Sequence, residues 1–68
     1  MTHEDRLPCP CCRNLTLRER GVAEICLVCG WEDDGQDDAD ADDVRGGVNG
    51  EISLTEARRS FRAFGVTR

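Results

Sequence analysis

The hydrophobic pattern is most regular near the end of the chain, where four apolar residues recur at spacings of three, four and three: Leu54, Ala57, Phe61 and Phe64. These spacings place the four side chains on one face of an α-helix. Just before them, Ser53 and Glu56 have the spacing of a capping box. Gly65 follows them and can adopt the left-handed backbone conformation that often ends a helix. The pattern therefore predicts a C-terminal helix over residues 53–65.

A second pattern lies between residues 14 and 25. Leu15 and Leu17 alternate with polar neighbours, as in a strand with one buried face. Gly21 falls in a turn, and the segment from Val22 to Ile25 leads back along the first strand. This predicts a β-hairpin over residues 15–25. Residues 32–51 have no hydrophobic period, so we expect an acidic, solvated loop there.

Two cysteine pairs flank the predicted hairpin, and each has two residues between its members: Cys9 with Cys12, and Cys26 with Cys29. Two cysteines three positions apart can both point inwards from one tight turn, which we call a claw. Two claws complete the tetrahedral coordination that zinc prefers. The spacing therefore predicts one structural Zn²⁺ ion held by these four thiolates.

The main alternative to zinc is a secreted domain stapled by disulfides. The odd count of five cysteines opposes it, and so does the absence of an apolar signal in residues 1–5. A redox Cys-x-x-Cys motif needs a larger βαβ setting than 68 residues can provide. We therefore expect a zinc protein of the reducing cytoplasm.

Three residues leave alternatives open at this site. Cys11 adjoins Cys12 and could replace it as a ligand, although the two-residue gap of the other claw favours Cys12. His3 could also replace a cysteine, but it lies six residues before Cys9 in a segment with no structural signal. The turn after each claw favours a positive φ, which Gly30 adopts freely and Arg13 adopts only at a cost of about 1 kcal/mol.

A chain of 68 residues buries little apolar surface, and zinc is expected to supply the missing stability. The predicted fold is a small metal-stabilised α+β domain over residues 1–68, with a zinc ribbon at 6–31, an acidic loop at 32–51 and a helix at 53–65. Without metal, we expect a largely unfolded chain. The candidate core residues are Leu15, Leu17, Val22, Ile25, Trp31, Ile52, Phe61 and Phe64.

Charge is distributed unevenly around a net value of −5. Residues 1–30 are neutral, residues 31–43 carry eight acids and no base, and residues 44–68 carry five Arg against two Glu. Such an acidic chain is poorly suited to wrapping nucleic acid. We expect the C-terminal arginines to neutralise the acidic loop of the same chain, with a phosphate-binding face as the weaker alternative.

These motifs together resemble a family of small bacterial cysteine-rich proteins named for the Cys-Pro-Cys-Cys sequence. The resemblance covers roughly residues 8–65. It rests on the Cys9–Cys12 motif, Thr16 with Leu17, Arg20 with Gly21, Glu24–Cys26, Cys29, Trp31–Gly35, Gly46 with Gly47, Asn49 with Gly50, and Ser53–Arg58. It implies a compact, cytoplasmic, zinc-binding domain, and the family carries no established activity.

Four cysteine ligands leave zinc no open position for water, and no nucleophile–base set accompanies them, so we do not expect an enzyme. The leading hypothesis is a protein-interaction or regulatory accessory module that presents Trp31, Asp33 and Asp34 to a partner with a basic surface. For Trp31 itself the favoured interpretation is a core residue that covers the claws, with the exposed anchor as the alternative. The longest apolar stretch is too short for a membrane span.

Two other functional classes stay open. One is a nucleic-acid-binding ribbon, for which the phosphate contacts would be Arg58, Arg59, Arg62 and Arg68. The other is a thiol redox sensor acting through Cys11. The sequence does not predict the oligomeric state.

Overall fold

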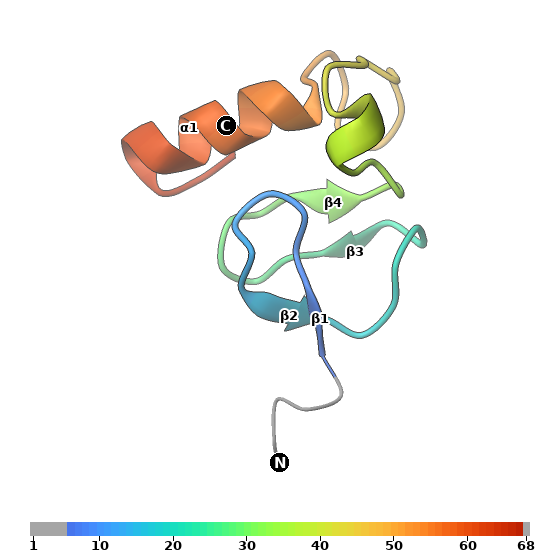
Figure 1. Ribbon diagram of the computed structural model, residues 1–68, viewed down its shortest axis with the longest axis vertical. Coiled ribbons are helices and arrows are strands. Elements are labelled where there is room, and N and C mark those ends of the chain that lie inside the picture. The colour runs from blue at the N-terminus through green and yellow to red at the C-terminus, as the bar shows by residue number, and fades with distance from the viewer. Residues whose placement is uncertain (1–5, 68) are drawn as a thin grey trace.

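The computed structural model describes residues 6–67. Its elements are the strands β1 (Leu7–Pro8), β2 (Leu15–Leu17), β3 (Glu24–Ile25) and β4 (Glu32–Asp33), the 3-10 helix η1 (Asp38–Asp40) and the helix α1 (Leu54–Phe64). Figure 1 shows the strands on one side of the molecule, with α1 across them and η1 beside the first turn of α1. The alternative ligand His3 and the candidate phosphate contact Arg68 lie outside the described residues.

The strands form two separate antiparallel hairpins, β1 with β2 and β3 with β4. Leu7 is opposite Leu17 in the first, and Glu24 is opposite Asp33 in the second. The predicted pairing of residues 15–17 with residues 22–25 is therefore wrong, although the small α+β class is confirmed. Each claw is itself the turn of a hairpin, so each strand pairs across its own cysteines.

The segment expected to be a solvated loop is folded in its first half. Gln36 is 1% exposed, and its Nε2 donates to the carbonyls of Asp40 at 2.9 Å and Asp43 at 2.7 Å. Asp37 caps η1, and its side chain accepts a hydrogen bond from the Asp38 amide. The chain thus winds around a buried amide group. Hydrophobic periodicity could not reveal this because polar groups organise the segment.

Helix α1 confirms the prediction at both ends. Ser53 and Glu56 form the capping box, and Gly65 has φ 80° and donates its amide to the Phe61 carbonyl at 2.8 Å. Leu54 and Ala57 are fully buried, but Phe64 is 80% exposed. The predicted burial of Phe64 is therefore wrong, because the last turn of α1 extends beyond the hairpins (Figure 1).

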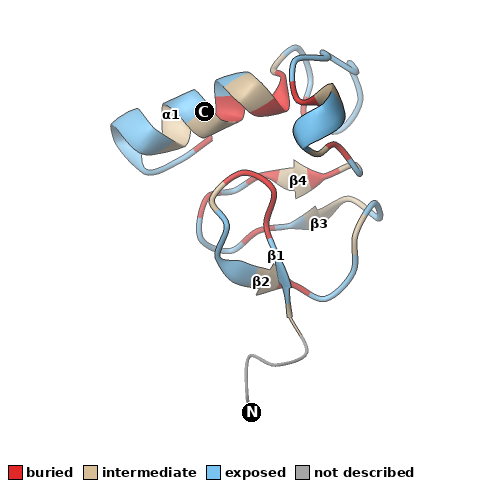
Figure 2. Cartoon of the chain, viewed as in Figure 1, coloured by how far each residue is buried: buried red, intermediate tan, exposed pale blue. Residues whose placement is uncertain are grey.

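The core lies between the claws and the first turns of α1, where Figure 2 shows the buried segments facing one another. Cysteines make up much of it, in place of several predicted residues: Leu15, Val22 and Ile25 are each about half exposed. Strands of two or three residues cannot cover both faces of a hairpin. The buried apolar residues are Cys9, Cys11, Leu17, Cys26, Cys29, Trp31, Ala41, Leu54 and Ala57.

Ile52 and Phe61 are partly buried against this core, so they match the predicted set only in part. Within residues 6–67, neither helix has the length and apolar character needed to cross a membrane.

Candidate metal centre

The two claws bring Cys9, Cys12, Cys26 and Cys29 together, with all four sulfur atoms within 4.8 Å of one another. The Sγ atoms of Cys9 and Cys29 are 3.6 Å apart, and those of Cys12 and Cys26 are 3.7 Å apart. A tetrahedral ion with metal–sulfur bonds of about 2.3 Å requires sulfur separations of about 3.8 Å. The cluster therefore fits a metal of this geometry.

The same distances argue against disulfides, whose sulfur atoms would be about 2.0 Å apart. All five cysteines are free thiols. Cys9, Cys26 and Cys29 are at most 2% exposed, whereas Cys12 is half-buried. One edge of the cluster therefore faces solvent.

The two claws have matching backbone hydrogen bonds. The Cys9 amide donates to the Asn14 carbonyl at 2.9 Å, and the Cys26 amide donates to the Trp31 carbonyl at 2.8 Å. Each bond spans the cysteine turn and joins it to the strands on either side. The first claw is therefore as well formed as the second.

Several donors point at the sulfur atoms, as expected around thiolates. The Cys11 amide donates to Cys9 Sγ at 3.4 Å, and the amides of Val28 and Cys29 donate to Cys26 Sγ at 3.4 and 3.5 Å. The Thr16 hydroxyl lies 3.0 Å from Cys26 Sγ and 3.5 Å from the Asn14 carbonyl. The sulfur is the closer acceptor for its single proton. Cys26 thus receives the most donors.

These donors affect the acidity of the thiols. Burial raises the pKa of both Cys9 and Cys29. Burial also acts to raise the pKa of Cys26, but the bonds from Thr16, Cys29 and Val28 outweigh it and lower that pKa to about 7. Cys26 is therefore the ligand that the protein itself best prepares as a thiolate.

Cys11 lies outside the four-sulfur set and is only 6% exposed. Burial raises its pKa to about 11. A reactive sensor thiol has the opposite properties, namely exposure and a lowered pKa. Its backbone amide nevertheless serves the site through the bond to Cys9.

Helix α1 and the residues after it are attached to both claws. The Arg58 Nε donates to the Pro10 carbonyl in the first claw at 2.8 Å. The Thr67 amide donates to the Cys29 carbonyl in the second claw at 3.0 Å. The helix is thus fastened on either side of the sulfur cluster.

The predicted interaction residues are largely internal. Trp31 and Asp33 are both 0% exposed, and Asp34 is half-buried, with its Oδ1 accepting from the Gln36 amide at 3.2 Å. Trp31 belongs to the core that covers the claws. Trp31 and Asp33 therefore cannot form the predicted contact surface, because a partner cannot reach them.

Asp33 holds Arg20, whose role the sequence analysis missed. The Arg20 Nε donates to Asp33 Oδ2 at 2.7 Å, Nη1 donates to Asp37 at 2.9 Å, and Nη2 donates to the Gln36 carbonyl at 2.8 Å. The hydrogen bond to Asp33 is the main reason that the pKa of Arg20 is raised. One arginine thus ties the connection between β2 and β3 to the start of the acidic segment, residues 32–43.

Arginines of this chain also pair with other acids of residues 32–43. Asp38 accepts from Arg58 at 2.7 Å and from Arg13 at 3.0 Å, and Asp40 pairs with Arg45. Internal neutralisation is therefore present, but Arg13 and Arg20 come from the N-terminal half as well. The sequence analysis placed it on the C-terminal arginines alone.

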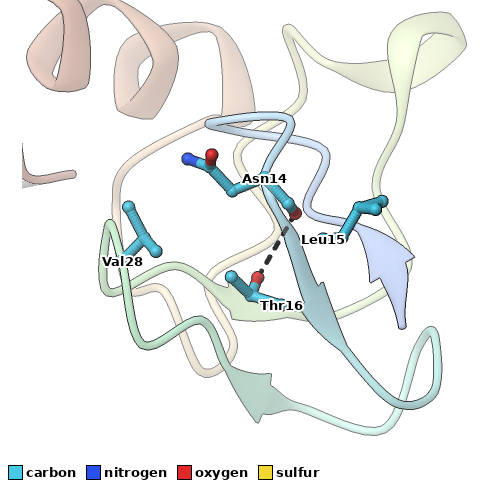
Figure 3. Close-up of a pocket in the computed structure, with 4 residues that line it drawn as sticks. All are labelled: Asn14, Leu15, Thr16 and Val28. Carbon is cyan, nitrogen blue, oxygen red and sulfur yellow. Dashed lines mark hydrogen bonds between the residues drawn. The ribbon is translucent and has the colours of Figure 1, made fainter. Parts of the chain in front are cut away.

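A shallow hollow of about 370 Å³ lies between the claws, lined by Asn14, Leu15, Thr16 and Val28. Figure 3 shows Asn14, Thr16 and Val28 around it, with a dashed line for the longer, 3.5 Å contact between the Thr16 hydroxyl and the Asn14 carbonyl. Since Thr16 also touches Cys26 Sγ, the hollow borders the sulfur cluster. It is open to solvent and lacks the enclosure of a substrate cavity.

Two hairpins, one helix and a four-cysteine cluster define a small α+β protein with a site that could bind a metal. The family described as Cysteine-rich CPCC matches residues 7–68, so the chain belongs to this family. The resemblance inferred from the sequence is thereby confirmed. A comparison with curated proteins gave no match.

Proposed function

We propose that this chain is a zinc-stabilised protein-interaction module that acts as an accessory subunit rather than an enzyme. The supporting observation is the cluster of four sulfur atoms, which belong to three cysteines that are at most 2% exposed and to the half-buried Cys12. Four thiolates occupy every position of a tetrahedral zinc ion and leave none for a substrate or water. The metal would therefore stabilise the fold, and the function would lie on the surface.

Zinc fits the donor set because a shell of four thiolates is typical of its structural sites. When bound, the ion would link the two claws and supply on the order of 10 kcal/mol of apparent binding free energy. Cys9, Cys12, Cys26 and Cys29 would hold it, with Thr16 and the claw amides orienting the sulfur atoms. This supports a module whose surface exists only in the metal-loaded state.

A native mass spectrum of the protein gently purified from its own host tests the proposal. We expect the mass of one zinc ion and a stoichiometric protein partner, and we expect both to be lost together after treatment with a chelator. Zinc without a partner would contradict the interaction role. A chain that carries no metal, or a partner that stays bound after metal removal, would contradict the metal-dependent module.

A further inference from the structure

The sulfur cluster contains two pairs that join one claw to the other. The Sγ atoms of Cys9 and Cys29 are 3.6 Å apart, and those of Cys12 and Cys26 are 3.7 Å apart. The two pairs are therefore almost equally close. They differ in exposure, because Cys9 and Cys29 are at most 2% exposed whereas Cys12 is half-buried. A small solute can thus reach the second pair from solvent, through Cys12.

Cys12 combines this exposure with the charge state that oxidants attack. A cysteine that binds a metal is a thiolate, and the thiolate is also the form that peroxides oxidise. Cys26 is 1% exposed, and the Thr16 hydroxyl lies 3.0 Å from its sulfur, so its own sulfur is shielded. Cys11 is 6% exposed and lies outside the four-sulfur set. Oxidation should therefore begin at Cys12.

An oxidised Cys12 has the Cys26 sulfur within reach. Disulfide sulfur atoms are about 2.0 Å apart, so the two Sγ atoms need to approach each other by about 1.7 Å. Cys12 and Cys26 belong to different claws, and the new bond would cross-link them. The site would then keep only Cys9 and Cys29 of its four ligands. Two sulfur atoms are too few for the tetrahedral coordination of a structural zinc ion.

We propose that Cys12 and Cys26 form a peroxide-sensitive switch that releases the metal from the module. In the first step, the Cys12 thiolate attacks one oxygen of hydrogen peroxide and the O–O bond breaks, which gives Cys12 sulfenic acid and hydroxide. In the second step, the Cys26 thiolate attacks the Cys12 sulfur and the S–O bond breaks, so that a second hydroxide leaves as the disulfide forms. The two sulfur atoms together lose the two electrons that reduce the peroxide.

The switch would act on α1 through the bonds that fasten it to the claws. The Arg58 Nε donates to the Pro10 carbonyl in the first claw, and the Thr67 amide donates to the Cys29 carbonyl in the second. Loss of the metal would loosen both claws and so remove the support of the helix. This inference rests on the proposed function and adds its regulation. The module would present its surface under reducing conditions and lose it when peroxide accumulates.

The test adds hydrogen peroxide to the zinc-loaded full chain beside a chromophoric chelator too weak to remove zinc by itself. We expect one zinc ion to be released for each peroxide consumed. Peptide mapping by mass spectrometry should find the Cys12–Cys26 disulfide as the first product, and circular dichroism should show a parallel loss of helix. Dithiothreitol with added zinc should restore the helix, because a disulfide can be reduced whereas a sulfinic acid resists reduction.

Two variants locate the switch. Cys12→His keeps four ligands, in the set of three cysteines and one histidine that zinc also accepts, but imidazole cannot form a disulfide. We expect this variant to bind zinc and to release it at least tenfold more slowly in peroxide. Cys11→Ser is the matched control, because it removes the neighbouring thiol that is not a ligand. Its rate of zinc release should equal that of the unaltered chain.

Other outcomes would contradict the inference. A first disulfide within one claw, or between Cys9 and Cys29, would show that the exposure of Cys12 does not direct the reaction through Cys26. A response that disappears in Cys11→Ser would make Cys11 the sensor. Zinc retained in peroxide would refute the switch and leave the proposed function standing, whereas a chain that binds no zinc would refute the proposed function. If Cys12→His fails to bind zinc, the disulfide map of the unaltered chain still decides.

Discussion

Arg13 and Gly30 occupy equivalent positions in the two claws. The Arg13 amide donates to the Cys9 carbonyl at 2.8 Å, and the Gly30 amide donates to the Cys26 carbonyl at 2.9 Å. Both residues have a left-handed backbone, with φ 70° and 89°. The turn imposes this conformation on both residues, although only glycine adopts it without strain.

Exchanging the residue types at these positions should have opposite effects. Gly30→Ala should lower the free energy of unfolding by about 1 kcal/mol, because alanine is strained at positive φ. Space is not the cause, since a Cβ there would lie 3.7 Å from Thr67 Oγ1. Arg13→Gly should leave stability unchanged or raise it, because the exposed Arg13–Asp38 pair is worth less than about 1 kcal/mol. Urea unfolding of metal-loaded protein measures both, and equal losses would contradict the equivalence.

The Thr16 hydroxyl should contribute to metal affinity through Cys26. Thr16→Val keeps the shape of the side chain but removes the donor, so we expect affinity for zinc to fall about tenfold. Thr16→Ser keeps the hydroxyl and is the matched control. Competition with a chromophoric chelator measures both variants. Unchanged affinity in Thr16→Val would show that the 3.0 Å contact does not stabilise the thiolate.

Trp31 should be required for the fold. Trp31→Ala removes a fully buried side chain and should cost about 3–5 kcal/mol, enough to lose the fold and the metal together. Trp31→Phe should be far milder, since the indole Nε1 has no hydrogen-bond partner in the described structure. Circular dichroism and metal content of the purified variants distinguish them. A folded, metal-loaded Trp31→Ala protein would contradict the core role.

The Arg20–Asp33 ion pair should contribute more to the free energy of unfolding than the exposed ion pairs do. Arg20→Ala leaves the Asp33 carboxylate, which is 0% exposed, without its cation, and we expect a loss of about 3 kcal/mol. Arg18→Ala is the control, because Arg18 is 76% exposed in its pair with Glu24 and should cost less than about 1 kcal/mol. Chemical denaturation compares the two. Similar small losses would mean that Asp33 is satisfied by the amides of Gly21 and Gly35.

The Asp38 carboxyl should stay ionised in mild acid. Hydrogen bonds from Arg58 and then Arg13 lower its pKa below the ordinary value of 3.8. A lowered pKa stabilises the folded state above the ordinary value, and this stability is lost as the pH falls through the folded value. Its window is therefore below about pH 4. Carboxyl ¹³C NMR of metal-loaded protein should show that Asp38 is still mainly ionised at about pH 4. Replacing Arg58 and Arg13 with glutamine should return the titration of Asp38 to the ordinary range.

The sequence predicted those features whose cause is local. The capping box, the left-handed Gly65 and the two cysteine claws all depend on residues within a few positions of one another. Strand pairing was mispredicted because two-residue strands carry no alternation, and the claw, rather than Gly21, reverses the chain. The Arg20–Asp33 pair joins residues 13 positions apart through a hydrogen-bonded ion pair, and no periodicity marks such a contact.

The bonds from Arg58 to Pro10 and from Thr67 to Cys29 make the order of α1 depend on the two claws. A helix of 11 residues is too short to persist alone in water, so α1 depends on the claws beneath it. If the claws depend in turn on the ion, ion uptake and helix formation are thermodynamically linked. The fraction of chains with an ordered α1 would then follow the concentration of free ion. The surface formed by α1 would therefore be present only when enough ion is available.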